Sequence, residues 1–286
     1  MEVHMIPNFS LIGESINDSV PSTHALFEAG DMDGIRALAQ FQAEKSAYID
    51  VNVGTRSADF LAEVVKLVQD AVALPLSIDT PDPEMAEAAL KVYDPSHGMP
   101  ILNSISPLRT EMFELFKICP FRPILLVTEH RVNGEDIACH TVEETFDAAR
   151  FMLQKAHEAG IPTTDCIFDP GVAPIGTDTE DNFKRLYQTM QKMHADPEFA
   201  GFHASVGLSN FTVMLPPRRA NGELVKTPLE SAFLTLTNPL GMDYCIGSVR
   251  RNYELLPEDH DALVCLRDCL GLEGYDVLTR VMEFCM

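Results

Sequence analysis

The 286-residue sequence has few basic residues and no long apolar run. Its 21 lysines and arginines stand against 43 aspartates and glutamates, which gives a formal net charge of -22. Such a surface repels phosphate groups, so we expect neither nucleic acid nor membrane as a partner. No stretch reaches the roughly 18 uninterrupted apolar residues of a membrane span, and the first residues lack the basic-then-apolar order of a signal peptide. We therefore expect a soluble, cytoplasmic protein.

The sequence also lacks the cysteine framework of a secreted protein. Its seven cysteines, an odd number, are scattered along the chain and are interpreted as reduced thiols. Cys265 and Cys269 lie one helical turn apart without an obvious His or Cys partner, so we expect no metal ligated by the chain. No linker rich in proline, glycine or serine interrupts residues 1–286, which predicts a single domain.

Apolar runs of strand length alternate with segments of helical periodicity along the whole chain. The predicted strands are Phe9–Ile16, Ala47–Val53, Leu74–Ile78, Pro100–Ile105, Pro123–Thr128, Cys166–Phe168, Phe202–Leu208 and Asp243–Gly247. The predicted helices are Asp33–Lys45, Ser57–Val72, Pro83–Tyr93, Pro107–Phe116, Thr141–Ala159, Asp178–Met193, Pro228–Leu236 and Pro257–Phe284. Eight such pairs are typical of a closed (β/α)8 TIM barrel, an α/β fold. A doubly wound sheet is the alternative, but no glycine-rich phosphate fingerprint follows the first predicted strand.

Local signals support this division of the chain. Thr141 with Glu144 fits a helix-starting capping box, and Gly160 stands where the same helix is expected to end. Three long segments between predicted elements, 131–140, 172–179 and 216–227, are rich in glycine, proline and charge. We expect them to form loops at the mouth of the barrel.

Polar residues recur where the predicted strands end, and the active site of such a barrel is built at that edge. They are Glu14, Asn17, Asp50, Asn52, Asp79, Asn103, Asp169, Ser209 and Asn210. One Asp at a strand end is typical of ordinary turns, so the evidence lies in the recurrence. Because this ring holds carboxylates and carboxamides without Lys or His, its acceptors need donors from a ligand. A carboxylate accepts two parallel hydrogen bonds from adjacent N–H groups, which favours a pterin or guanine edge.

The polar motifs also follow one another in a distinctive order. They are Gly13-Glu14-Ser15-Ile16-Asn17, Asp50-Val51-Asn52-Val53-Gly54, Asp79, Asn103-Ser104, Asp169-Pro170, Gly207-Leu208-Ser209-Asn210 and Arg218. In this order the chain resembles the pterin-binding corrinoid methyltransferases over nearly its whole length. The resemblance implies a barrel like that of dihydropteroate synthase. It also implies transfer of a methyl group between the 5-nitrogen of tetrahydrofolate, as 5-methyltetrahydrofolate, and the cobalt of a corrinoid.

The resemblance assigns roles to individual residues. It implies that the pterin edge is held by Asp79, Asn103 and Asp169, and that Gly207 and Ser209 shape the floor beside it. Asn210 would face the 5-nitrogen, and Asp79 is the nearest carboxyl for supplying a proton, so both are predicted to be catalytic. A carboxamide suits that nitrogen because it offers a donor and an acceptor before and after protonation. The residues expected to support the pocket are Glu14, Asn17, Asp50 and Asn52.

The resemblance also raises the questions of which molecule supplies the cobalt and which residue contacts the glutamate tail of folate. The chain contains no Asp-x-His-x-x-Gly cobalt-ligand motif, so a corrinoid (cobalamin), free or on a partner protein, must supply the cobalt. Arg218 is a candidate contact for the glutamate tail of folate. The segment 211–217 is more apolar than expected of the acetogen-type enzymes, which favours a role in demethylation of glycine betaine or methoxyaromatics. The family also implies a homodimer.

Two other functions remain open from the sequence. Dihydropteroate synthases share the barrel and the pterin pocket, but they carry a basic residue at the position of Asn210. Arg250 and Arg251 could imitate the last basic group of that family. A non-catalytic folate-binding subunit would keep the same pterin residues, so only an assay of methyl transfer separates it from the enzyme.

Overall fold

The structure of the protein is a computed structural model that describes residues 6–132 and 134–286. The first five residues, part of the argument against a signal peptide, lie outside it, as does residue 133 in the predicted loop 131–140. Among the described residues, no helix is long and apolar enough to cross a membrane.

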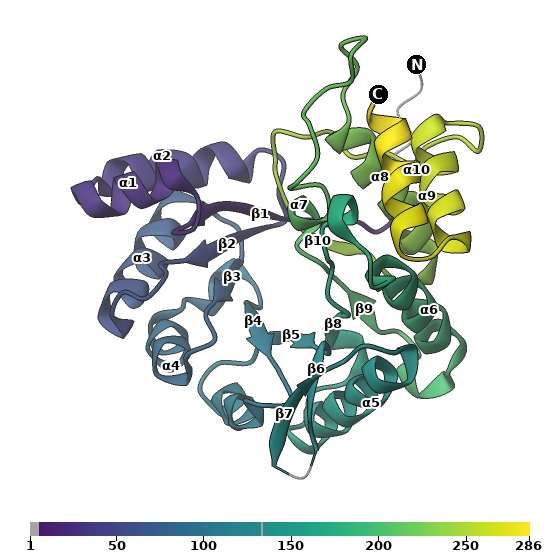
Figure 1. The fold of residues 1–286 in the computed structure, drawn as a ribbon. Helices are drawn as coiled ribbons and strands as arrows, with labels where there is room; N and C mark the ends of the chain where they lie inside the picture. Colours follow the sequence, from purple (N-terminus) through teal and green to yellow (C-terminus); the bar gives the residue numbers. More distant parts are fainter. Residues whose placement is uncertain (1–5, 133) are drawn as a thin grey trace.

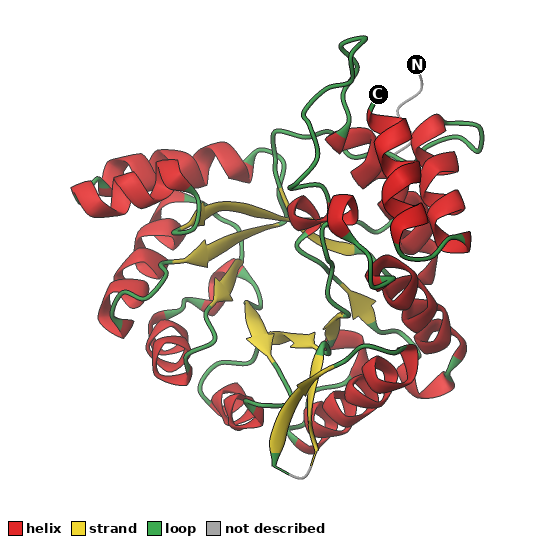
Figure 2. Ribbon diagram, in the orientation of Figure 1, coloured by secondary structure: helices red, strands yellow, loops and turns green. Residues whose placement is uncertain are grey.

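Eight parallel strands form a barrel that is surrounded by helices (Figures 1 and 2). In spatial order they are β10 (Tyr244–Gly247), β1 (Ser10–Asn17), β2 (Tyr48–Asn52), β3 (Leu76–Asp79), β4 (Ile101–Ile105), β5 (Arg122–Leu126), β8 (Ile167–Asp169) and β9 (His203–Ala204). The last seam is closed by two isolated parallel bridges beside β9 and β10, Ala204 with Met242 and Gly207 with Ile246, and the Ile246 N–H donates to the Val206 carbonyl at 3.1 Å. The predicted (β/α)8 fold is confirmed.

Helices follow the strands and cover the outside of the barrel. Their bounds are α1 (Pro21–Ala29), α2 (Met32–Ala43), α3 (Ala58–Ala71), α4 (Pro83–Val92), α5 (Val142–Glu158), α6 (Asn182–Ala195), α7 (Leu208–Phe211), α8 (Lys226–Thr237), α9 (Asp261–Gly271) and α10 (Tyr275–Cys285). Side chains at Asp31, Ser57 and Asp82 accept N–H groups from the first turn of their helices, and the capping box of Thr141 and Glu144 is formed as predicted.

Several predicted elements differ from the structure. Helix α1 was not predicted, and the helix predicted over Pro107–Phe116 is a 3-10 helix, Thr110–Lys117. The segment predicted as one helix over Pro257–Phe284 is two helices, separated where Gly274 adopts a φ of 52°. Most of the predicted loop 131–140 belongs to an antiparallel hairpin, β6 (Glu129–Val132) with β7 (Glu135–Ala138), which projects from the barrel in Figure 1.

An apolar layer closes the inside of the barrel. It consists of Ile12, Tyr48, Ile101, Ile124, Ile167 and Tyr244, all of which are buried and pack as one cluster. Because side chains alternate along a strand, the residue two positions further on faces the same interior. Four of the six positions reached in this way are polar: Glu14, Asp50, Asn103 and Asp169.

The hydroxyls of Tyr48 and Tyr244, whose rings belong to the apolar layer, meet two charged residues at the other end of the interior. We call these four residues the lower layer: Tyr48, Arg122, Asp165 and Tyr244. Arg122 donates from Nη1 to the Tyr244 hydroxyl at 2.6 Å, and its Nε lies 3.3 Å from Asp165 Oδ1. Burial raises the pKa of Tyr244 to about 12, so this hydroxyl stays protonated. These contacts seal the amino-terminal end of the barrel.

Candidate active site

Residues at the carboxyl ends of β2, β3, β4 and β8 form what we call the upper layer: Asp50, Asp79, Asn103 and Asp169. Three of them follow the apolar layer at a spacing of two: Tyr48 precedes Asp50, Ile101 precedes Asn103, and Ile167 precedes Asp169. Asp79 lies directly opposite Asn103 in the register of β3 and β4. The alternation of strand residues thus directs these side chains into one end of the barrel.

Asp50 and Asp79 are two carboxyl groups close enough for their charges to interact. Asp50 is 1% exposed, and its Oδ1 has no hydrogen-bond partner among the described residues. Burial, followed by the negative charge of Asp79, holds the pKa of Asp50 well above its usual range. Burial also raises the pKa of Asp79, whose Oδ2 accepts a hydrogen bond from Asn52 Nδ2 at 2.9 Å. Both shifts favour a proton on this pair, and Asn52 orients Asp79.

Asp169 supplies a carboxylate from β8, across the barrel from β2 and β3. Its Oδ1 accepts the backbone N–H of Gly171 at 2.8 Å, which fixes its orientation at the end of the strand. Burial raises its pKa to about 6, while the Gly171 N–H and the charge of Arg185 act in the opposite direction. Near neutral pH this group is mostly an acceptor.

The segment after β9 brings three of the predicted residues together. Ser209 Oγ donates to Glu14 Oε1 at 2.6 Å, which connects α7 to β1, and burial raises the pKa of Glu14. Asn210 is exposed, and a Cβ added at Gly207 would lie 2.9 Å from its Nδ2. Because Gly207 has no side chain, the Asn210 amide can lie close to its backbone.

Two predicted residues interact elsewhere. Asn17 Oδ1 accepts from the backbone N–H of Ser19 at 2.9 Å and from its hydroxyl at 2.7 Å, so Asn17 organises the turn after β1. Arg218 is exposed and donates to the Gly222 carbonyl at 2.6 Å within the loop that precedes α8.

A buried carboxylate that the sequence analysis missed organises the segment carrying Asn210. Glu230 of α8 is completely buried, and its Oε1 is shared by the Thr212 hydroxyl and the Arg251 guanidinium. Thr212 directly follows α7, and Arg251 lies in the loop after β10. The available signal was a charged residue inside an apolar stretch of helix, Leu229–Leu234.

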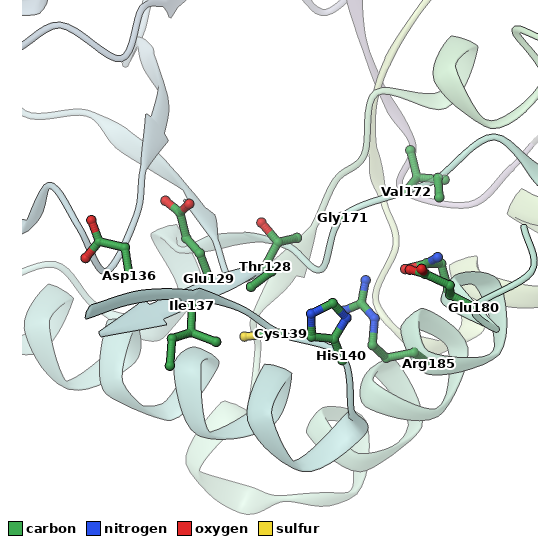
Figure 3. A pocket seen from close by; sticks show the side chains of 13 residues that line it. Thr128, Glu129, Asp136, Ile137, Cys139, His140, Gly171, Val172, Glu180 and Arg185 are labelled. Carbon is green, nitrogen blue, oxygen red and sulfur yellow. The ribbon is translucent and has the colours of Figure 1, made fainter. Parts of the chain in front are cut away.

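A cavity of about 450 Å³ adjoins the Asp169 end of the site, below the β6–β7 hairpin (Figure 3). Thr128, Glu129, His140, Gly171 and Arg185 are among the residues that line it. Arg185 was also missed by the sequence analysis, although it is a cation within a buried stripe of α6, between Phe183 and Leu186.

The comparisons with known proteins follow this geometry. A family model described as pterin binding enzyme matches residues 45–247, which include β2 to β10 and every upper-layer residue. This chain is a pterin-binding enzyme. The match confirms the family that the order of the polar motifs indicated.

Individual relatives of this pterin-binding enzyme agree in fold and family. A methylcorrinoid:tetrahydrofolate methyltransferase of Eubacterium limosum is 28% identical over 243 residues, covering 82% of this chain and 83% of the relative. Among solved structures, dihydropteroate synthase of Xanthomonas albilineans superposes with a TM-score of 0.54 at 20% identity, covering 93% of this chain and 91% of the other. The Thermus thermophilus dihydropteroate synthase gives 0.53 at 20% identity, with 93% and 94% covered. These two structures establish the shared barrel.

The upper layer of this pterin-binding enzyme suits a ligand rich in N–H groups. Its carboxylates and its carboxamide oxygen are acceptors, and Asp50 Oδ1 lacks a donor among the described residues. Within the part of the chain that the structure describes, no three His, Cys, Asp or Glu residues gather in a way that could hold a metal ion. The site can bind and orient a heterocycle, and its coupled carboxyl pair can hold a proton.

Proposed function

We propose that this protein transfers a methyl group between the cobalt of a corrinoid and the 5-nitrogen of tetrahydrofolate. The name of the E. limosum relative describes this reaction, and that protein aligns over most of this chain. The corrinoid supplies or accepts the methyl group. It is a substrate from outside, either free or carried by a partner protein.

The observation that carries the proposal is the set of acceptors at the upper end of the barrel, of which Asp50 is buried and Asp79, Asn103 and Asp169 are half-buried. A pterin presents adjacent ring N–H and amino groups, which match carboxylates such as Asp79 and Asp169 as paired donors. Asn103 adds a carboxamide that can serve either as donor or acceptor, next to Asp79 in the register. Unfilled hydrogen-bonding capacity in a buried site is costly, so a ligand of this kind completes it.

Asn210 is the proposed contact to the 5-nitrogen. Its amide is exposed at the end of the barrel that the acceptors occupy, and Glu14 holds the neighbouring Ser209 in place. The Nδ2 group can donate to the nitrogen lone pair, and the Oδ1 atom can accept its N–H once it is protonated. Asn210 thereby contacts both protonation states of the 5-nitrogen. It stabilises the positive charge on this nitrogen in the transition state, in whichever direction the methyl group moves.

The proton that this nitrogen gains or loses requires a second group. Burial, with the charge of Asp79, holds the pKa of Asp50 well above its usual range, which favours a proton on the Asp50–Asp79 pair. We propose that Asp79 exchanges this proton with the ligand, directly or through water. Asn52 keeps the carboxyl group of Asp79 oriented during the exchange.

Contacts in the site count against a dihydropteroate synthase. Position 210 carries a neutral carboxamide rather than a basic side chain, and Arg251 forms an ion pair with the buried Glu230. The likeness to dihydropteroate synthases therefore supports the fold of this chain rather than its reaction.

The finer features of the proposal rest on the sequence. We propose that the enzyme works in demethylation of glycine betaine or methoxyaromatics, since segment 211–217 is apolar and leaves Val213 and Met214 exposed beside the site. A single-domain, cytoplasmic homodimer is also proposed, and Arg218 is proposed to meet the glutamate tail of folate.

The test is to mix the purified protein with methylcobalamin and tetrahydrofolate without oxygen and to follow the cobalamin absorbance. We expect loss of methylcobalamin with formation of methyltetrahydrofolate. Asn210→Ala should lower this rate by about 10- to 1,000-fold, the scale of a lost acid–base contribution. Asn221→Ala, on an exposed part of the following loop, is the matched control and should retain the rate.

Calorimetry with tetrahydrofolate separates the outcomes. If folate binds and neither free nor protein-bound corrinoid exchanges a methyl group, the chain is a binding subunit and the enzymatic proposal is wrong. If Asn210→Ala turns over at the wild-type rate, Asn210 has no part in the chemistry.

A further inference from the structure

Arg185 lies behind the turn that carries Asp169. It belongs to the first turn of α6, is 8% exposed, and donates from Nη1 to the Pro170 carbonyl at 3.2 Å. The same Nη1 atom donates to the Thr145 hydroxyl at 2.8 Å, and that hydroxyl donates to the Thr141 carbonyl at 2.9 Å. Arg185 therefore joins the turn after β8 to both α5 and α6. Figure 3 shows its side chain reaching from α6 into the cavity.

Gly171 in this turn leaves no room for a side chain. It has a φ of 73°, and a Cβ there would clash with Thr128 Cγ2 at 2.1 Å and lie in ordinary contact with Arg185 Nη2 at 3.9 Å. A residue other than glycine at position 171 would therefore displace Thr128 and strain the backbone. The guanidinium thus contacts the same backbone segment whose N–H orients Asp169.

The carboxylates around Arg185 differ in the number of hydrogen bonds that they already accept. Asp178 accepts the N–H groups of Asn182 and Phe183 at the start of α6. Glu144 accepts those of His140 and Thr141 in the capping box.

Asp169 has a single hydrogen bond, from Gly171, among the described residues. Cys139 also faces Arg185, and burial raises the pKa of this thiol to about 11, so it is neutral. Asp169 thus has fewer hydrogen bonds than Asp178 or Glu144. Glu129, His140 and Glu180 also line the cavity beside Arg185.

The positive charge of Arg185 lowers the pKa of Asp169, whereas burial raises it. Burial raises the pKa of Asp169 to about 6, and Arg185 together with the Gly171 N–H keeps it from rising further. Burial also lowers the pKa of Arg185 from its usual value, but a guanidinium remains charged in proteins.

We propose that Arg185 is a positioning residue, which fixes the Asp169–Gly171 turn and keeps the Asp169 carboxylate ionised to accept hydrogen bonds from the pterin. This inference rests on the proposed function and names the group that prepares one of its acceptors. Arg185 acts through Asp169 and is not assigned a contact with the ligand.

The experiment measures the dissociation constant of tetrahydrofolate by calorimetry between pH 5 and 8.5, without oxygen, for the wild-type protein and Arg185→Met. The wild-type affinity should fall as the pH drops through about 6, because Asp169 is protonated there. In Arg185→Met the midpoint should move upward by about 1 pH unit, the low end of the effect of one nearby opposite charge. Arg185→Lys keeps a cation and should restore most of the wild-type profile.

Two further variants keep the test decisive. Asp169→Asn should remove this step from the profile, and adding Arg185→Met to it should produce no new shift. If Arg185→Met does not fold, Thr145→Val removes only the hydroxyl that receives Nη1, and should shift the midpoint in the same direction by less.

The outcomes separate the inference from the proposed function. An unchanged midpoint in Arg185→Met, or in Thr145→Val if that variant is used instead, overturns the inference, even where affinity falls equally at every pH. Absence of folate binding by the folded wild-type protein overturns the proposed function and the inference with it. A shifted midpoint that Lys restores and Asp169→Asn abolishes supports the role of Arg185.

Discussion

The two ends of the barrel interior both contain charged residues, but these residues differ in whether they have hydrogen-bond partners within the protein. In the lower layer, Arg122 bridges Tyr244 and Asp165, so a cation and its acceptors satisfy one another. In the upper layer, Asp50 and Asp79 lie together, and no donor to Asp50 Oδ1 is found in the part of the chain that the structure describes. The lower layer is complete as folded, whereas the upper layer is complete only with a ligand. The comparison teaches that the amino-terminal end of this barrel serves stability and the carboxyl-terminal end serves binding.

The largest expected effect comes from removing one acceptor of the upper layer. Asp79→Asn keeps the shape of the side chain but loses its charge, so tetrahydrofolate affinity should fall by about 10- to 100-fold, the value of a hydrogen bond to a charged group. Calorimetry measures this, and urea unfolding should show no loss of stability. Asp70→Asn, on the exposed surface of α3, is the control. Unchanged affinity would place the pterin elsewhere.

The reverse pattern is expected in the lower layer. Arg122→Met should lower the free energy of unfolding by about 2 kcal/mol, because the Tyr244 hydroxyl and Asp165 lose their common donor. Folate affinity of the folded variant should not change. Arg150→Met removes a surface ion pair with Asp196 and should cost less than about 1 kcal/mol in the same urea titration. A loss of affinity in Arg122→Met would erase the distinction between the two layers.

The pH dependence of stability should reveal the crowded carboxyl groups. The folded pKa of Asp169, about 6, lies above its ordinary value of 3.8, so the folded state binds more protons than the unfolded state between these values. The ligand-free protein should therefore become more stable as the pH falls from 7 to 5.

Urea titrations at both pH values measure this gain, and in Asp169→Asn it should shrink. That variant should also be more stable at pH 7, by up to about 3 kcal/mol, because it no longer buries a charge. A wild-type protein that loses stability over this range would contradict the upper-layer assignment.

The smallest effect is expected outside the barrel. Arg218→Ala should weaken tetrahydrofolate binding by no more than about 5-fold, because an exposed ion pair contributes at most about 1 kcal/mol. A pterin without the glutamate tail is the matched control, and its affinity should be the same in both proteins. An equal loss for both ligands would show that Arg218 does not contact the tail.

The sequence predicts the parts of this molecule that follow from local periodicity. The barrel and the upper layer could be predicted because Asp50, Asn103 and Asp169 each stand near the end of an apolar run, and parallel strands bring such ends together. The β6–β7 hairpin and the break before α10 were missed because short polar segments have no strong period.

Arg185 and Glu230 were missed for a different reason. Their partners, such as Thr145 for Arg185 and Arg251 for Glu230, lie 40 and 21 residues away in the sequence. Partners so far apart in the sequence do not produce a recognisable pattern in the residues around Arg185 or Glu230. The side chains that support a site are thus harder to predict than those that line it, because their partners are chosen by the packing of whole helices.

The close approach of Asn210 to Gly207 limits how this barrel could evolve. Any side chain at position 207 would occupy the space of the Asn210 amide, whose Nδ2 would lie 2.9 Å from the new Cβ. A substitution at position 207 therefore requires the Asn210 side chain to move or to be replaced. If Asn210 is replaced while Gly207 is kept, the new side chain has the space that the missing Cβ leaves. A change at position 207 therefore acts on the group at position 210, while the acceptors on β2 to β8 can persist unchanged. One lineage can in this way acquire a new reaction and still recognise its old heterocycle.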